Sequence, residues 1–268
     1  MVTSAVLLLG GYGLVLAGMF FFQRNLLYYP DASLPDPVLS GVAEMSPIKA
    51  QSSDGLTLVS WFGQGNPNLP VIVYFHGNAG NIGSRGHKVR PFLDAGFGVL
   101  LVGYRGYGGN AGNPSQTGLL ADARAAIESL QNNSEAGRSL VFYGESLGTA
   151  VATIIAAERA LANNPVQALI LEAPFTSISD AAQHYYPFIP VRWLLKDTFD
   201  QESLIGSVSA PVFVFHGEKD KTMPIRFGKA LFEKAQTPKT SKWYEEAGHN
   251  NLFDFGAGEL TIEFIRSN

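Results

Sequence analysis

The segment from Val141 to Ala157 restricts the possible folds of this chain more than any other stretch. It reads VFYGESLGTAVATIIAA: an apolar run typical of a strand, a serine between two glycines, and an alanine-rich run typical of a helix. The pentapeptide GESLG around Ser146 fits G-x-S-x-G, a tight turn in which the glycines let strand and helix approach closely. The pattern predicts that Ser146 projects from a strand end, beside the positive end of a helix.

Continuous apolar runs elsewhere predict the strands of a parallel sheet, because such runs suit strands that are buried on both faces. They lie at residues 71–75, 99–104, 140–143, 168–173 and 212–216, with a last strand at 242–244. Helix-like segments alternate with them at 89–95, 116–131, 147–162 and 225–234, and a last helix is expected at 252–266. An antiparallel hairpin is expected from strands around 44–51 and 56–62. The order predicts an α/β fold with a mostly parallel central sheet and helices on both faces.

The N-terminal residues have the composition of a membrane helix. From Ala5 to Phe22 there are 18 residues without a charge, which as a helix span about 27 Å, close to the hydrocarbon thickness of a bilayer. We therefore expect a transmembrane anchor over residues 1–25, embedded through residues 5–22, and a main domain over 26–268. A cleaved signal peptide and a buried hydrophobic helix are the alternatives, although no Lys or Arg precedes the run as in a signal peptide.

The residues within and after this run give weaker indications. Tyr28 and Tyr29 fit the headgroup level of a bilayer, and the alternative is that they pack on the domain. Gly13 and Ala17 form a small-xxx-small pair that would permit a homodimer, but so common a pattern does not predict one. Arg24 is the only basic residue nearby, so charge does not specify the side of the membrane on which the domain lies.

A long apolar insert interrupts the alternation of strands and helices. Residues 175–208 contain two tyrosines, three phenylalanines, a tryptophan and a leucine pair, which is more apolar surface than an ordinary connection carries. We expect a cap or lid over the site, with structural helices that merely cover the sheet as the alternative.

The overall composition excludes several classes of function. The formal net charge is −4 and no cluster of Lys and Arg is present, which argues against a nucleic-acid partner. The chain has no cysteine, so it has no disulfide, thiolate metal site or cysteine nucleophile. No other pattern predicts a metal site.

A serine hydroxyl becomes a nucleophile only when a base takes its proton, and the base needs an acid to orient it. Among five histidines, His249 lies in a loop between the last strand and the last helix, beside a glycine. His76 and His216 directly follow strand runs, where a structural role at the strand end fits better. We therefore expect His249 to be the base.

Asp220 is the expected acid, because it follows the strand run at 212–216. The order Ser146, Asp220, His249 matches one known triad arrangement. Glu172, at the end of another strand, and Glu218 are the alternatives.

Acyl transfer also requires donors for the oxygen that becomes negatively charged. The backbone N–H of Leu147, directly after the nucleophile, is the first expected donor. The second is expected in the glycine-rich loop HGNAGN after the first buried strand, from the N–H of Asn78, with Ala79 as the alternative.

The motifs GESLG, HGNAGN, YRGYGGNAGNP, HGEKDKTMP and AGHNN, in this order, resemble the α/β-hydrolase superfamily. They look most like its membrane-anchored Bem46-like branch, and the similarity runs from about residue 26 to the C-terminal helix. The resemblance implies the α/β-hydrolase fold and serine hydrolysis of carboxylic esters or thioesters, including lipid-like acyl substrates, without a cofactor. It also implies a structural role for the YRGYGG segment beside the loop that holds Asn78.

Two other classes compete with this interpretation. The segment 106–111 fits the G-x-G-x-x-A pattern of a nucleotide-binding turn, but Pro114 separates it from the next helix. The second alternative is a membrane-tethered binding or scaffold protein that keeps the hydrolase fold without catalysis, because fold alone does not prove activity.

Overall fold

A central sheet organises this computed structural model, which describes residues 2–131, 137–236 and 238–268. Within that part of the chain its strands, in sheet order, are β10 (Lys239–Tyr244), β9 (Val212–Gly217), β8 (Ala168–Glu172), β7 (Leu140–Glu145), β4 (Val71–Phe75), β6 (Gly98–Leu101), β3 (Thr57–Gly63) and β2 (Ser46–Gln51). Neighbours from β10 to β6 pair in parallel, whereas β3 is antiparallel to both β6 and β2. The predicted mostly parallel sheet and its hairpin are confirmed.

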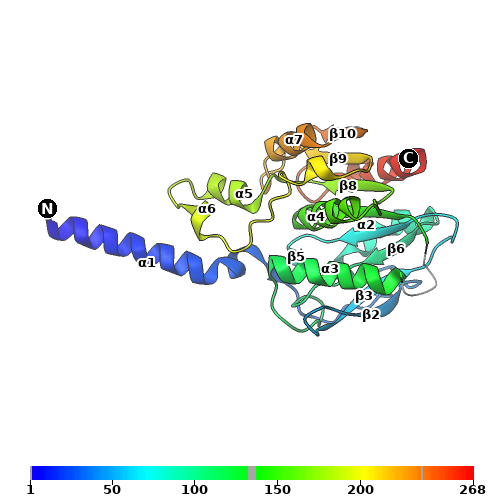
Figure 1. The fold of residues 1–268 in the computed structure, drawn as a ribbon, viewed down its shortest axis with the longest axis horizontal. Helices are drawn as coiled ribbons and strands as arrows, with labels where there is room; N and C mark the ends of the chain where they lie inside the picture. Colours follow the sequence, from blue (N-terminus) through cyan, green and yellow to red (C-terminus); the bar gives the residue numbers. More distant parts are fainter. Residues whose placement is uncertain (1, 132–136, 237) are drawn as a thin grey trace.

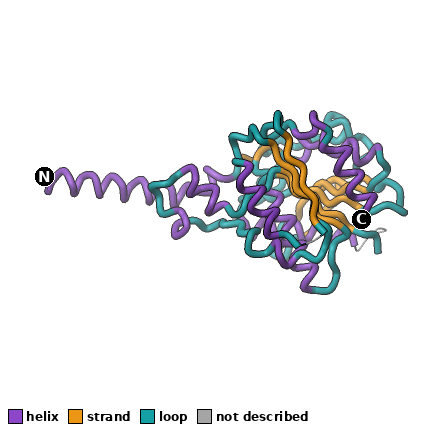
Figure 2. The backbone as a smooth tube through the Cα atoms, turned by 90° about the horizontal axis from the view of Figure 1, so that it is seen from above, coloured by secondary structure: helices purple, strands orange, loops and turns teal. Residues whose placement is uncertain are grey.

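Helices cover both faces of the sheet, as Figures 1 and 2 show. One layer contains α3 (Gln116–Gln131), α4 (Leu147–Leu161) and α7 (Ile225–Lys234), and the other contains α2 (Gly86–Asp94) and α8 (Ala257–Ser267). The expected final helix from residue 252 is divided into a 3₁₀ turn, η3 (Leu252–Phe255), and α8. The division falls at Gly256, whose φ of 84° is left-handed and interrupts the helix.

Alternate residues of the central strand β4 pack against opposite helical layers. Val71, Val73 and Phe75 belong to the core beneath α3 and α4, and Ile72 and Tyr74 belong to the core beneath α2 and α8. All five side chains are fully buried. Two buried faces explain why this strand is a continuous apolar run in the sequence.

The turn from β7 into α4 depends on two glycines that admit no side chain. A Cβ at Gly148 would lie 1.9 Å from the carbonyl oxygen of Phe75 in the neighbouring strand, and one at Gly144 would lie 2.4 Å from the Cα of Thr149. Ser146 between them has a φ of 51° and a ψ of −116°, a strained conformation for a residue with a side chain. The turn therefore holds Ser146 at the end of β7 at a conformational cost that the surrounding packing offsets.

The parallel strands bring the expected site residues to one edge of the sheet. Ser146 follows β7, Asp220 follows β9, His249 follows β10, and Asn78 follows β4. Because carboxyl ends of parallel strands lie at the same edge, these four segments meet there.

The N-terminal helix α1 (Val2–Leu27) projects away from the sheet (Figure 1). Its segment from Val6 to Leu27 is long and apolar enough to cross a membrane, by length and composition. The insert, residues 175–208, is called the cap below and contains α5 (Ile178–Tyr185), α6 (Val191–Leu194) and a 3₁₀ turn, η2 (Ile205–Ser207). The cap lies against the C-terminal half of α1, where Asp197 pairs with Arg24.

The chain after α1 adds a small feature that the sequence does not predict. Strand β1 (Tyr29–Pro30) pairs in parallel with β5 (Ala79–Gly80), next to the 3₁₀ turn η1 (Ile82–Arg85). Tyr28 is buried, and its hydroxyl donates a hydrogen bond to Asp197 at 3.1 Å. The expectation that both tyrosines lie at headgroup level is wrong for Tyr28, because packing on the domain satisfies both its ring and its hydroxyl; Tyr29 is exposed.

Replacing Gly148 with alanine tests the packing of the turn. We expect G148A to lower the free energy of unfolding by about 3 kcal/mol or more, because the added methyl group meets a backbone carbonyl that cannot rotate away. G206A is the matched control, since a Cβ there has ordinary contact at 3.6 Å from the Lys234 carbonyl oxygen. Urea unfolding of the full chain in detergent measures both, and equal stabilities would contradict the proposed constraint.

Candidate active site

Ser146, His249 and Asp220 form a continuous hydrogen-bonded chain. The Nε2 atom of His249 lies 3.0 Å from Oγ of Ser146, and its Nδ1 atom lies 2.6 Å from Oδ2 of Asp220. Two loops and a strained turn, far apart in sequence, thus place three side chains in the order that the sequence suggests. Such an arrangement is able to move a proton from the hydroxyl to the imidazole.

The surroundings of Asp220 keep its carboxylate ionised. Burial raises the pKa of this carboxyl, but hydrogen bonds from His216 and His249 and the backbone N–H of Met223 outweigh burial and hold the pKa well below its usual range. The other oxygen, Oδ1, accepts the N–H groups of Thr222 and Met223 at 2.8 and 2.7 Å.

This ionised carboxylate determines which ring nitrogen of His249 carries the proton. Because the carboxylate only accepts hydrogen bonds, Nδ1 of His249 carries the proton that it donates to Asp220. In the neutral ring, Nε2 is then left with a lone pair that faces the hydroxyl of Ser146. The imidazole is thus held in the tautomer that a general base requires.

His216 is a site residue that the sequence analysis assigned to the strand end alone. Its Nε2 atom lies 2.7 Å from the carbonyl oxygen of Met223 and 3.0 Å from Oδ2 of Asp220, so this nitrogen carries the proton and donates to both. The ring is fully buried under Gly228. The signal in the sequence was its position four residues before Asp220, at the end of the strand that leads into the turn.

The two alternative acids, Glu172 and Glu218, contact other side chains rather than His249. Glu172 accepts a hydrogen bond from Lys88 at 2.7 Å and one from the hydroxyl of Tyr143 at 2.5 Å, and it is buried beneath the turn. Glu218 is exposed and lies 4.0 Å from Lys229. The structure therefore brings Asp220, rather than either glutamate, to His249.

Asn78 and Leu147 line the same pocket as Ser146, and the pocket lining does not include Ala79. The Leu147 N–H is the first of helix α4, where it has no partner within the helix. The peptide that carries the Asn78 N–H is oriented by His76, whose Nδ1 donates to the Gly77 carbonyl at 2.7 Å. Because C=O and N–H point in opposite directions in a trans peptide, this bond turns the Asn78 N–H away from His76.

Burial, reinforced by the positive charge of Arg85, lowers the pKa of His76 to about 3. The ring is therefore neutral at working pH. Its Nδ1–H tautomer follows from the carbonyl partner, and Nε2 has no partner within the described residues.

The segment from Tyr104 to Gly109 braces the Asn78 loop from the outside. The Tyr107 hydroxyl donates to the Asn78 carbonyl at 2.7 Å. Arg105 fixes the segment itself through ion pairs to Asp122 and Asp54, both at 2.6 Å. This contact gives the YRGYGG motif a structural role beside the loop.

A buried cluster of charges beneath the turn was not predicted. Glu145, directly before Ser146, is paired with Arg85 at 2.9 Å and with Lys88 at 3.3 Å, and Lys88 also pairs with Glu172 at 2.7 Å. Arg85 in turn donates to the carbonyl of Ala79 at 2.8 Å. Two cations and two carboxylates therefore join the turn to the loop that holds Asn78.

The pocket in front of Ser146 is mostly apolar. It is lined by the end of α1, by α5 and by the turn after Asp220, with Leu27, Phe175, Ile178, Ala181 and Met223 among its walls. Within the described residues, no group of three or more His, Asp or Glu side chains has the arrangement of a metal site.

Residues 66–204 match the family described as serine aminopeptidase, S33. An uncharacterized protein of Mycobacterium tuberculosis is 37% identical over 267 residues, which cover 94% of this chain and 90% of that protein. Protein bem46 of Schizosaccharomyces pombe is 32% identical over 226 residues, which cover 79% of this chain and 74% of its own. The chain belongs to the α/β-hydrolase family, in its Bem46-like branch.

The fold of this Bem46-like hydrolase is shared with solved esterases. A Pyrococcus furiosus esterase aligns with a TM-score of 0.68 at 14% identity, over 90% of this chain and 96% of the esterase. The expected family and fold class are confirmed, and membership in the family makes the chain a hydrolase.

The choice of acid is tested by two amide substitutions. We expect D220N to lower kcat by about 10⁴-fold, because an amide no longer fixes the tautomer of His249. E172Q is the matched control: it leaves the His249 hydrogen bonds intact and mainly lowers stability, because Lys88 loses one of its two buried carboxylate partners. Ester hydrolysis measured per folded molecule distinguishes the two, and near-full activity of D220N would reject this assignment.

The buried charge cluster predicts a pH-dependent stability. Burial raises the pKa of Glu145, but Lys88 and Arg85 outweigh burial and hold that pKa well below its usual 4.5. Its ion pairs therefore stabilise the fold fully above about pH 4.5, and this stabilisation is lost as the pH falls below that value. We expect E145Q to be about 3–5 kcal/mol less stable than the parent at pH 7, with a smaller difference in acid.

Urea unfolding at pH 7 and in the acid range measures this difference. E158Q is the control, because Glu158 forms an exposed pair with Arg124 and its loss costs at most about 1 kcal/mol. A difference between E145Q and the parent that does not change with pH would contradict the assignment.

Proposed function

We propose that this chain is a membrane-anchored serine hydrolase that cleaves carboxylic esters or thioesters of lipid-like acyl substrates. The observation that carries the proposal is the hydrogen-bonded chain from Asp220 through His249 to Ser146, which ends in an apolar pocket. Family membership supports hydrolysis, and the hydrogen-bond geometry supports Ser146 as the nucleophile, His249 as the base and Asp220 as the acid.

In the proposed reaction, the Ser146 Oγ–H gives its proton to Nε2 of His249 as Oγ attacks the substrate carbonyl carbon. The carbonyl oxygen becomes an oxyanion and is held by the N–H groups of Leu147 and Asn78. The imidazolium, stabilised by Asp220, then donates its proton to the leaving oxygen or sulfur, and an acyl-enzyme results. Water activated by the same imidazole attacks the acyl carbon, which frees the acid and restores Ser146.

The pocket lining favours an acyl chain over a peptide N-terminus. Within the described residues that line it, no carboxylate is present to pair with the α-ammonium group of a peptide. Apolar walls from α1, α5 and Phe175 instead match a hydrocarbon chain. An ester or thioester of such a chain therefore fits the pocket better than a peptide, the substrate that the name of the matched family implies.

We assign membrane anchoring to α1. Its exposed apolar side chains, among them Leu7, Leu8, Leu9 and Leu14, have no partner surface among the described residues, and a bilayer buries such surface. The domain is thereby held where amphiphilic substrates are concentrated.

Labelling by a fluorophosphonate tests the proposed function. We expect the parent chain to be labelled and to hydrolyse p-nitrophenyl butyrate, and we expect S146A to lose both the label and the hydrolysis. The substitution removes one oxygen atom and leaves the turn intact, so the control for folding is an unchanged urea midpoint. A parent chain that is neither labelled nor active would favour the scaffold alternative.

A further inference from the structure

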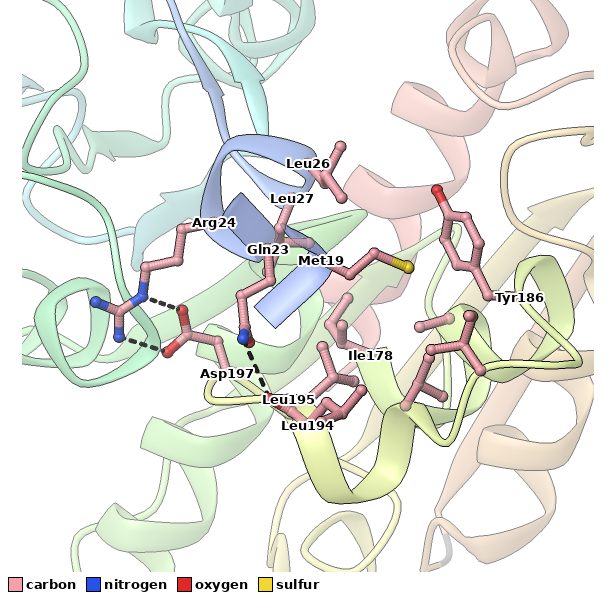
Figure 3. Close-up of a pocket in the computed structure, with 13 residues that line it drawn as sticks. Met19, Gln23, Arg24, Leu26, Leu27, Ile178, Tyr186, Leu194, Leu195 and Asp197 are labelled. Atoms are coloured by element: carbon pink, nitrogen blue, oxygen red, sulfur yellow. Dashed lines mark hydrogen bonds and ion pairs between the residues drawn. The ribbon is translucent and has the colours of Figure 1, made fainter. Parts of the chain in front are cut away.

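A second apolar cavity lies between α1 and the cap, as Figure 3 shows. It is called the acyl groove below. Its walls include Met19 and Leu27 from α1 and Ile178, Ala182, Ile189 and Leu195 from the cap. The acyl groove therefore exists only because the N-terminal helix lies against the hydrolase domain.

The acyl groove adjoins the pocket in front of Ser146 and shares walls with it. Leu26, Leu27, Ile178, Ala182 and Tyr186 line both cavities. From Leu27 to Met19, the groove follows α1 for about 12 Å away from the pocket. A chain attached to a carbonyl at Ser146 thus has an apolar path along the helix.

Polar groups that lie along this path are paired. Arg24 is bound to Asp197 at 2.8 Å. The side chain of Gln23 donates to the Leu194 carbonyl and accepts the N–H of Lys196 at 2.7 Å. These bonds leave the groove walls apolar and fix α1 to the cap at the same time.

The cap accompanies α1 far toward its N-terminus. The hydroxyl of Tyr12 donates to the carbonyl of Phe188 at 2.7 Å, so helix and cap lie together from Tyr12 to Arg24, about 18 Å of helix. The candidate membrane span, Val6–Leu27, includes all of this stretch. If that span crosses a bilayer, the part of the cap beside it lies within the membrane.

The position of Lys196 along α1 agrees with immersion of this part of the cap in a bilayer. Its ammonium group lies 4.4 Å from the Phe20 ring, and its exposed side chain is thus near Met19, at the end of the groove farthest from the pocket. With Lys196 at the phosphate level, the apolar part of α1 on the N-terminal side of Phe20 lies in the hydrocarbon. Phe188, whose carbonyl is bonded to Tyr12, then lies there as well.

The cap tip, residues 186–194, has the surface expected for a lipid environment. Phe188 and Trp193 are 88% and 89% exposed, which is unusual for large apolar side chains in water. The charged side chain of this stretch, Arg192, is paired with Asp180.

The backbone carbonyl groups of the cap tip are hydrogen-bonded within the chain. Each carbonyl from Tyr186 to Val191 accepts a hydrogen bond from within the chain. The donors are the Gln183 side chain, the Tyr12 hydroxyl and backbone N–H groups, and two of the six positions are prolines, which carry no N–H. Pairing of these six carbonyls lowers the cost of moving this part of the loop from water into hydrocarbon.

From these observations we infer that the cap tip is immersed in the bilayer beside α1, and that the acyl chain of a membrane lipid enters the acyl groove directly from the membrane and reaches Ser146 along it. This inference rests on the proposed function, because it names the source of the substrate for the same site. It makes the anchor helix a wall of the substrate site as well as a tether.

Filling the acyl groove tests the path. We expect M19W to lower kcat/KM for p-nitrophenyl palmitate in phosphatidylcholine vesicles at least about ten-fold relative to kcat/KM for p-nitrophenyl butyrate. I189W, which fills the groove from the cap side, is expected to act in the same way. L14W is the matched control, because Leu14 lies on α1 outside the groove and is exposed.

The outcomes separate the inference from the proposed function. An unchanged palmitate-to-butyrate ratio in both M19W and I189W, with fluorophosphonate labelling retained, would overturn the acyl groove alone. A fall of the same size in L14W would overturn it too, because the effect would then come from α1 in the membrane. A parent chain that is inactive on both esters and is not labelled would instead reject the proposed function.

The absence of cysteine from the chain permits a direct test of immersion. F188C and L161C each introduce a single thiol at a highly exposed apolar position, and each is labelled with an environment-sensitive fluorophore. In vesicles we expect blue-shifted emission for F188C, with quenching by nitroxide lipids, and neither for L161C on the domain. Water-like emission from both would overturn the immersion of the cap tip.

Discussion

The contact between Gly148 and the Phe75 carbonyl is the constraint on which the site depends. It brings the start of α4 against β4, so that the serine between the two glycines must adopt a left-handed φ at the end of its strand. Only in that conformation does Oγ of Ser146 face the loop that carries His249. The cost of the conformation is met by the core on both faces of the sheet, and the site is therefore a property of the whole fold.

Beneath this turn, buried charges fix the orientation of the groups that they join, which apolar packing alone would not do. Apolar side chains would fill the space, but the pairing of Glu145 with Arg85 fixes the direction of each group as well. Through the bond from Arg85 to the Ala79 carbonyl, the turn and the loop after β4 are held in register. Removal of one partner would leave an unpaired charge in the interior, so the cluster tolerates change poorly.

The sheet, its helices and the hydrogen-bonded chain of Ser146, His249 and Asp220 could be predicted because their sequence signals are local. Buried runs mark strands, the G-x-S-x-G turn marks Ser146, and a glycine-flanked histidine in the last loop marks His249. The cluster around Lys88 could not be found in this way, since its partners are about 60 to 84 residues apart along the chain and no spacing rule joins them. The burial of Tyr28 was only the alternative for the same reason, because it depends on Asp197 in the cap.

The last turn of α1 is bonded to the loop that faces Ser146. The side-chain amide of Asn78 donates to the Leu27 carbonyl at 2.8 Å, and the Tyr29 N–H donates to the Asn78 carbonyl at 2.9 Å. A shortened chain that starts after Leu27 would therefore lose a brace of the candidate site along with the helix. Kinetic constants measured on such a fragment would not describe the full chain, even if the fragment is soluble and folded.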